Sequence, residues 1–266
     1  MRSIRAASVS ALLFIAATAC RDASTAPADA DNLLAADVAV VAGDAVFEDV
    51  NVIYTQVGAF GVPTGVVERT GGWQSDCPFD QSTGRFNCPT ITREHMTLSR
   101  SYAFADAAGA AQAAYSATTT ERANFVTSMS GNVARDGWSA TIERARNITV
   151  SGLVGAETQH TINGVGSNTE SRSRHTDGGD RTYEMSAVAT FANVVVPFPR
   201  SRGAWPLSGT VTREITATRD GPAGGGTRSR TTVVTFNGTR FATMVVGDRS
   251  FTVDLATGRT APRRVR

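Results

Sequence analysis

The feature that most constrains the fold of this chain is a hydrophobic period of two, which begins near residue 90. In the run Trp205–Thr216 the odd positions are mostly apolar, and the even positions carry Ser, Thr or Glu. In another run Trp138, Ile142 and Ile148 alternate with polar residues. Such alternation is typical of antiparallel strands that bury one face and expose the other. Thr suits the exposed face because it is both β-branched and polar.

Turn signals separate these runs, and their spacing predicts long strands. The wide intervals predict several strands of about 12 to 16 residues, or roughly 40 to 50 Å. We therefore expect a mainly-β chain of the α+β class, with one large curved antiparallel sheet that is a meander or an open barrel. The predicted turns are Asp106–Gly109, Arg135–Gly137, Asp177–Asp180, Pro197–Gly203, Asp220–Gly226, Asn237–Gly238 and Gly247–Asp248.

Three segments depart from this pattern. Over 32–53 the apolar residues follow helical spacing, which predicts an amphipathic helix, kinked at Gly43, that packs on the sheet. The Ala-rich segment Ala107–Ala117 is expected to be extended rather than helical. Thr158–His175 is almost wholly polar, which predicts a hairpin projecting past the core or a charged edge strand.

The first twenty residues indicate export and lipid attachment. Residues 1–5 carry two positive charges, Arg2 and Arg5. The uncharged run Ala6–Ala19 that follows is too short to span a bilayer as a helix. The residues Ala-Thr-Ala-Cys at 17–20 resemble the lipobox of bacterial lipoproteins, in which lipid is attached to the Cys thiol and cleavage occurs just before it. The resemblance makes Cys20 the lipidated residue, although the family more often has Leu where Ala17 stands. The alternative is an ordinary signal peptide with a coincidental Cys.

The residue after Cys20 bears on the membrane. In lipoproteins of double-membrane bacteria, an Asp directly after the lipidated Cys tends to retain the protein at the inner membrane. Arg21 stands there instead, which implies the outer membrane. The attached acyl chains, palmitate among them, supply the membrane affinity. We expect a signal peptide over 1–19, the lipidated Cys and a flexible tether over 20–31, and a single mainly-β domain with its N-terminal helix over 32–266.

The two remaining cysteines, Cys77 and Cys88, predict a structural disulfide. They flank a segment with turn chemistry at Thr83–Gly84, and exported proteins rarely keep unpaired thiols. The alternative is a two-Cys metal site, which has no His or further Cys nearby to complete it.

Charge and motifs exclude several function classes. The chain has 26 basic and 24 acidic residues, and removal of Arg2 and Arg5 with the signal leaves it about neutral, so there is no electrostatic case for nucleic acid. It contains no Gly-x-Ser-x-Gly elbow, no Lys for a phosphate-binding loop and no His-x-x-x-His pair. We therefore expect no catalytic residues and no cofactor.

Two clusters leave alternatives open. His160 and His175, with Asp177 and Asp180, are candidate ligands for a metal ion. The preferred interpretation is that they are solvated residues of a strand and a turn, so no metal is expected. A second set of residues is either an anion-binding face for a lipid or glycan headgroup or, as preferred, a solvated Arg/Glu/Thr face. That set comprises Arg144, Arg146, Arg172, Arg174, Arg181, Arg213, Arg228 and Arg230.

The whole pattern resembles uncharacterised secreted bacterial lipoproteins with a helix followed by a Thr-rich β-meander. The closing blocks Phe236–Phe241 and Phe251–Arg259 carry this resemblance, which implies no activity. We expect a non-enzymatic envelope lipoprotein whose sheet is a binding or structural surface, with the membrane, a lipid, a glycan or an envelope protein as partner. The alternative is a carrier of a lipid or other hydrophobic ligand in a cleft between sheet and helix. An enzyme is the third possibility.

Overall fold

The structure is a computed structural model, and it describes most of the chain beyond residue 76. The described residues are Ala39, Ala42, Gly43, Ala45, Val46, Asp49, Val50 and the ranges 77–135, 138–155, 158–174, 181–199, 203–220 and 226–262.

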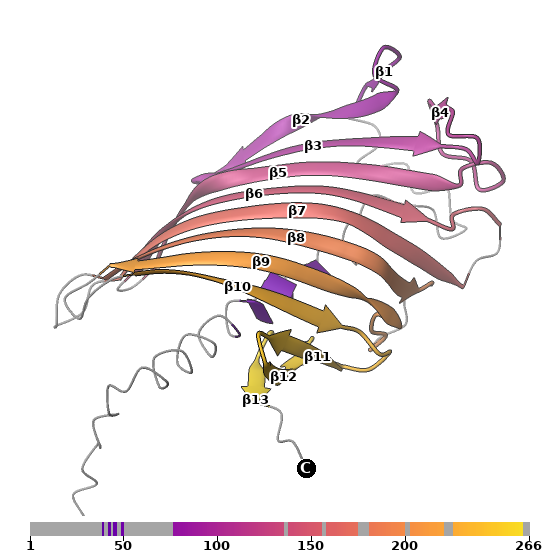
Figure 1. Cartoon of the computed structure of the whole chain (residues 1–266). Coiled ribbons are helices and arrows are strands. Elements are labelled where there is room, and N and C mark those ends of the chain that lie inside the picture. The colour runs from indigo at the N-terminus through magenta and orange to yellow at the C-terminus, as the bar shows by residue number, and fades with distance from the viewer. Residues whose placement is uncertain are drawn as a thin grey trace, which may run out of the picture.

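The described chain forms one broad antiparallel sheet of thirteen strands (Figure 1). Its order is sequential from β1 to β13, except that the short β4 lies beside β3 only, so the sheet is an open meander. The strands are β1 (Phe79–Asp80), β2 (Arg85–Arg93), β3 (Met96–Ala105), β4 (Ala111–Gln112), β5 (Arg122–Arg135), β6 (Trp138–Ser151), β7 (Gln159–Arg174), β8 (Arg181–Pro197), β9 (Ser208–Asp220), β10 (Gly226–Thr235), β11 (Phe241–Val246), β12 (Arg249–Asp254) and β13 (Thr260–Pro262).

Alternation divides the sheet into two faces. On β6 the side chains of Ala140, Ile148 and Val150 are buried, whereas those of Ser139 and Thr141 are exposed. We call the face of the sheet with the buried side chains the inner face, and the opposite face the outer face. The central strands β5 to β9 are 13 to 17 residues long, so the predicted long strands and single large sheet are confirmed.

The inner face carries the hydrophobic core. Aromatic rings from β2, β3 and β5 pack together at one end of it, where Phe86 stacks on Tyr102 with ring centroids 4.6 Å apart. The core continues across the sheet through Ile162, Phe191 and Val211 to Met244 on β11. Isolated sheets of two strands are marginal in water, and this contiguous apolar face is what stabilises so wide a sheet.

The three predicted turns that the structure describes completely, Asp106–Gly109, Asn237–Gly238 and Gly247–Asp248, lie between strands, and the other four lie wholly or partly outside the described residues. Gly109 donates its N–H to the carbonyl of Asp106 at 3.0 Å after β3, and Gly247 and Asp248 join β11 to β12. Asn237 and Gly238 lie in the connection of the β10–β11 hairpin, as the sequence predicts. The segment Ala107–Ala117 contains β4 and turns, without a helix.

One prediction about the sheet is wrong. The polar segment Thr158–His175 is neither a projecting hairpin nor an edge, because its strand β7 pairs along its length with β6 and β8. The polar residues are accommodated because those on the inner face have partners. Arg144 donates to Asn168 at 3.1 Å, and Arg172 donates to the buried Glu170 at 2.9 Å.

The predicted N-terminal helix lies mostly outside the described residues. The seven separate residues described there do not make a complete helix. Ala39, Ala42, Val46 and Val50 are nevertheless buried in the same core cluster as the inner face of the sheet. The described chain contains no helix with the length and apolar character needed to cross a membrane.

Candidate functional site

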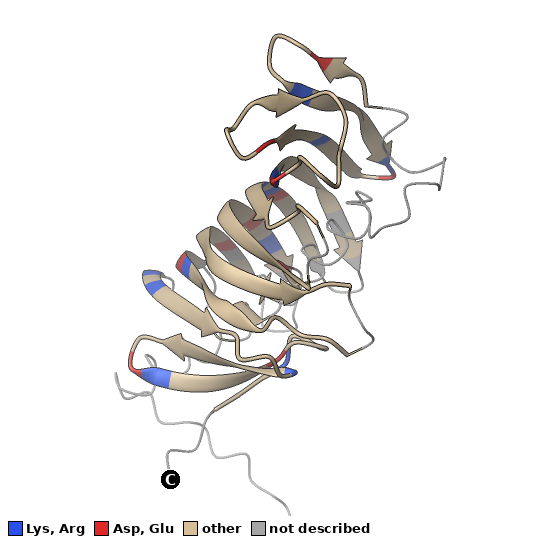
Figure 2. Ribbon diagram, turned by 90° about the vertical axis from the view of Figure 1, so that its right-hand side faces the viewer, with Lys and Arg blue, Asp and Glu red and all other residues tan. Residues whose placement is uncertain are grey.

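The arginines that the sequence singled out share one face, and it is the inner one. Arg144 and Arg146 alternate with exposed residues on β6, and Arg230 pairs directly with the buried Ile215. The same register puts Arg172, Arg213 and Arg228 on the inner face. The interpretation of these residues as a solvated face is wrong for Arg213, which is 4% exposed, whereas Arg172 and Arg228 are exposed to solvent. The side chains of Arg174 and Arg181 lie outside the description. Figure 2 shows basic positions distributed over successive strands.

Two of these arginines stand at the ends of one cross-strand row. Arg146 pairs with Gly166, Gly166 with Ala189, and Ala189 with Arg213, so the row crosses β6, β7, β8 and β9. Three strand spacings separate the two arginine backbones by about 14 Å. Because the residues between them are Gly and Ala, space remains above the sheet for another side chain.

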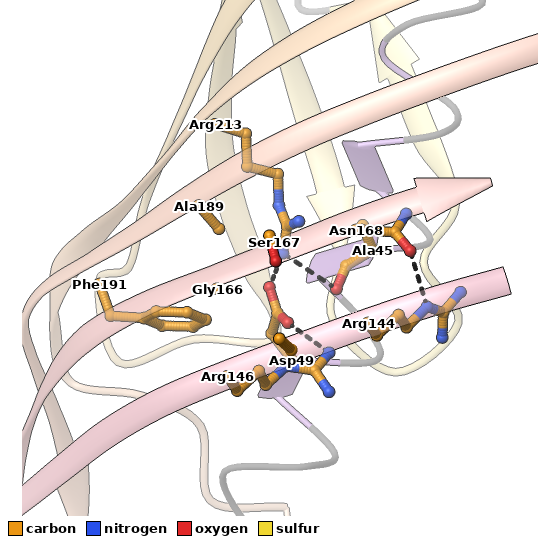
Figure 3. A pocket seen from close by; sticks show the side chains of 11 residues that line it. Ala45, Asp49, Arg144, Arg146, Gly166, Ser167, Asn168, Ala189, Phe191 and Arg213 are labelled. Carbon is orange, nitrogen blue, oxygen red and sulfur yellow. Dashed lines mark hydrogen bonds and ion pairs between the residues drawn. The ribbon is translucent and has the colours of Figure 1, made fainter. Parts of the chain in front are cut away.

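Asp49 from the N-terminal segment fills that space (Figure 3). Its Oδ1 accepts a hydrogen bond from Arg146 Nη2 at 2.8 Å, and its Oδ2 forms an ion pair with Arg213. Arg213 also donates to the carbonyl of Ala45 at 3.4 Å. Asp49 is 2% exposed and Arg213 is 4% exposed, so this is a buried charge cluster. We call Asp49, Arg146 and Arg213 the Asp49 cluster.

The cavity beside the Asp49 cluster is small. It has a volume of about 20 Å³ and is lined by Ala45, Arg144, Asn168 and Phe191, among others. That volume accommodates about one water molecule, whereas pockets for small-molecule ligands are roughly 300 to 1,000 Å³. The cluster is therefore suited to holding the N-terminal segment on the sheet rather than to binding a separate ligand.

The predicted disulfide is present. Cys77 and Cys88 are bonded, with their Cα atoms 4.1 Å apart. The bond joins the chain just before β1 to the middle of β2, and both cysteines pack against the hydrophobic core. The other predicted modification site, Cys20, lies outside the described residues.

The histidine cluster is only partly described. His160 lies on the inner face of β7, 3% exposed, and its ring stacks on Phe198 with centroids 4.4 Å apart. Desolvation lowers the pKa of His160 from 6.5 to about 4, so it is neutral at physiological pH. His175, Asp177 and Asp180 fall outside the description. Among the residues that are described, no three His, Cys, Asp or Glu side chains are grouped as metal ligands.

Sequence reasoning missed Asp49. A signal for it exists, because Val46, Asp49, Val50 and Ile53 share one side of the predicted helix. A lone carboxylate on an otherwise apolar face indicates a buried cationic partner.

The comparisons add no relative: no family model, no curated protein and no solved structure matches this chain.

Proposed function

We propose that this protein is exported and anchored through acylated Cys20 to the envelope, at the outer membrane, where its sheet is a non-enzymatic binding or structural surface. The segment 20–31 is the tether, and the segment after it packs on the inner face as the predicted amphipathic helix. The closing blocks that resemble secreted lipoproteins, and the lipobox-like segment at 17–20, support this reading.

The observation that carries the proposal is the difference between the two faces of the sheet: the inner face is largely apolar and the outer face is polar. The apolar residues of the inner face form the hydrophobic core, and the Asp49 cluster holds the N-terminal segment against this face. The outer face exposes Ser, Thr and Glu side chains over many strands. A wide sheet whose inner face carries the core and whose outer face is polar and exposed is suited to contact with a partner.

The same observation bears on the alternative, a carrier of a hydrophobic ligand between helix and sheet. Beside the few described residues of the N-terminal segment, the space between Asp49, Ala45 and the inner face is about 20 Å³. An acyl chain needs a far larger volume. Native mass spectrometry of the purified protein tests this alternative, since co-purified lipid, beyond the covalent anchor, would favour the carrier.

The anchor is tested by expressing the full chain in a double-membrane bacterium and analysing its N-terminus by mass spectrometry. We expect a chain that begins at an acylated Cys20 and partitions with the outer membrane. The Cys20→Ala variant should lose the acyl mass and the membrane partitioning.

A matched control is the Cys77→Ala/Cys88→Ala double variant, which removes the other cysteines and should leave acylation unchanged. An unmodified chain, or unchanged partitioning of Cys20→Ala, would contradict the proposed anchor.

A further inference from the structure

The outer face of β6 to β9 contains two complete cross-strand rows of polar side chains. In the first row Glu143 pairs with Thr169, Thr169 with Ser186, and Ser186 with Thr216. In the second row Thr141 pairs with Ser171, Ser171 with Glu184, and Glu184 with Thr218. The rows are adjacent, because their members stand two positions apart on each strand.

These rows line a groove of about 420 Å³. Glu170 and Met185, at intervening positions of β7 and β8, complete the lining. The volume lies within the range of small-molecule sites, roughly 300 to 1,000 Å³. Each row has a small side chain, Ser186 or Ser171, at one of its two middle positions.

Several polar groups of the groove have hydrogen-bonding capacity left for a ligand. Thr216 shares a hydrogen bond with Ser229 at 2.8 Å, and Thr218 shares one with Thr227 at 2.8 Å. Each hydroxyl has one donor and two acceptor positions, so such a bond does not exhaust it. The exposed carboxylate of Glu184 is an acceptor only, and it stands between the hydroxyls of Ser171 and Thr218.

The charge of the groove selects among ligand classes. Its outer-face lining contains two exposed carboxylates, Glu143 and Glu184, and no basic side chain. Phosphate, sulfate and carboxylate ligands are therefore disfavoured. The lining contains no aromatic ring, so a flat aromatic ligand has nothing to stack on. Hydroxyls dominate, and they both donate and accept.

We propose that this groove binds a neutral carbohydrate chain. Sugar hydroxyls donate to Glu143 and Glu184, as adjacent hydroxyls suit the two oxygens of a carboxylate, and they exchange hydrogen bonds with the Thr and Ser side chains. The rows continue beyond the groove, to Ser130 and Asn132 on β5 and to Ser229 and Thr227 on β10. This polar track crosses six strands, or about 24 Å, which favours a polymer over a single sugar ring. The inference rests on the binding role proposed above and names its ligand.

The test is isothermal titration calorimetry of the purified full chain, in a detergent without a sugar headgroup, against the neutral hexasaccharides cellohexaose and chitohexaose. Spermidine and hexagalacturonate serve as cationic and anionic comparison probes. We expect binding of at least one neutral hexasaccharide and none of hexagalacturonate. Glu184→Gln should weaken that binding about tenfold, because it removes a charged acceptor. Thr218→Val should weaken it about threefold to tenfold.

Glu214→Gln and Thr212→Val are the matched controls, since both residues lie on the outer face of β9 but do not line the groove. They should bind the sugar as the unaltered chain does. Circular dichroism of every variant reports folding, which exposed outer-face substitutions should leave unchanged.

Absence of binding to both neutral sugars at millimolar concentration would overturn the inference, as would binding of spermidine alone or equal weakening by the control variants. The calorimetry needs no acylation, so its failure leaves the Cys20 anchor standing. Failure of the anchor likewise leaves the sugar result standing.

Discussion

Asp49 and Arg146, 97 positions apart in the chain, are joined by a hydrogen bond of 2.8 Å on the inner face of the sheet. The same carboxylate pairs with Arg213, so one side chain contacts two strands that are not hydrogen-bonded neighbours. In the cross-strand row, Gly166 and Ala189 stand between the two arginines. The position of the N-terminal segment is thus specified by charge as well as by apolar contact.

Asp49→Asn should destabilise the protein by about 3–5 kcal/mol. The substitution preserves the shape but removes the negative charge, which leaves the buried guanidinium of Arg213 and the half-buried guanidinium of Arg146 without this carboxylate. Urea denaturation followed by circular dichroism measures the change. The control is Asp254→Asn, which breaks the more exposed ion pair with Arg240 and should have a much smaller effect. Equal losses in the two variants would show that burial of the Asp49 cluster contributes nothing.

Removal of the disulfide should cost about 3 kcal/mol. Cys77 and Cys88 are 11 positions apart, and the cross-link restricts the unfolded chain over that loop. The Cys77→Ala/Cys88→Ala double variant, compared with the unaltered protein in urea, measures the loss. Alkylation without reductant should leave both cysteines unmodified. Labelling of both in the folded protein would contradict the bond.

His160 should make stability depend on pH. Because the pKa of His160 in the folded protein is lowered to about 4, the unfolded state, with a pKa near 6.5, takes up the proton first. Its contribution is therefore complete above pH 6.5 and declines as the pH falls toward 4, with a slope of at most about 1.4 kcal/mol per pH unit.

Urea titrations of the unaltered protein and of His160→Gln between pH 7 and pH 5 test this expectation. The difference in unfolding free energy between the two should shrink as the pH falls. A difference that is independent of pH would mean that His160 is not desolvated.

Gly209→Ala should destabilise by about 2–5 kcal/mol. Gly209 is the second residue of β9, next to the irregular pairing with β8, and has φ +97°. An added Cβ would lie 2.2 Å from the carbonyl oxygen of Asn193. The expected loss combines the left-handed conformation with the clash. Gly155→Ala, at φ +85° with nothing within 4 Å of the added Cβ, should cost only about 1–2 kcal/mol. Thermal unfolding of the two variants gives the comparison, which fails if their midpoints coincide.

The strands were predictable because alternation is a local signal. Residues such as Ile148 and Ser139 reveal their faces by position alone, and Gly247 and Asn237 mark turns through backbone chemistry that needs no tertiary information. The disulfide was predictable by elimination, because the expected lipidation of Cys20 leaves Cys77 and Cys88 as the one pair of cysteines.

The central place of β7 was not predictable from polarity. Burying a carboxylate such as that of Glu170 is costly without a charged partner, and the sequence alone does not reveal that partner. In the folded sheet Arg172 donates to Glu170 and compensates its charge. The Asp49 cluster depends on two more quantities that a single sequence does not give, namely the order of the strands and the register that aligns Arg146 with Arg213. The outer-face groove is of the same kind, because Glu143 on β6 and Glu184 on β8 come to line one groove only when β7 pairs between them.

The sequential strand order has a consequence for how the molecule is assembled. A chain released N-terminus first can add each hairpin to the growing edge as it emerges, without waiting for distant parts. Asp49 is the exception: it emerges early, yet its second guanidinium arrives only with β9. The ion pair between Asp49 and Arg213 therefore forms only after β9 has joined the sheet, late in the addition of strands.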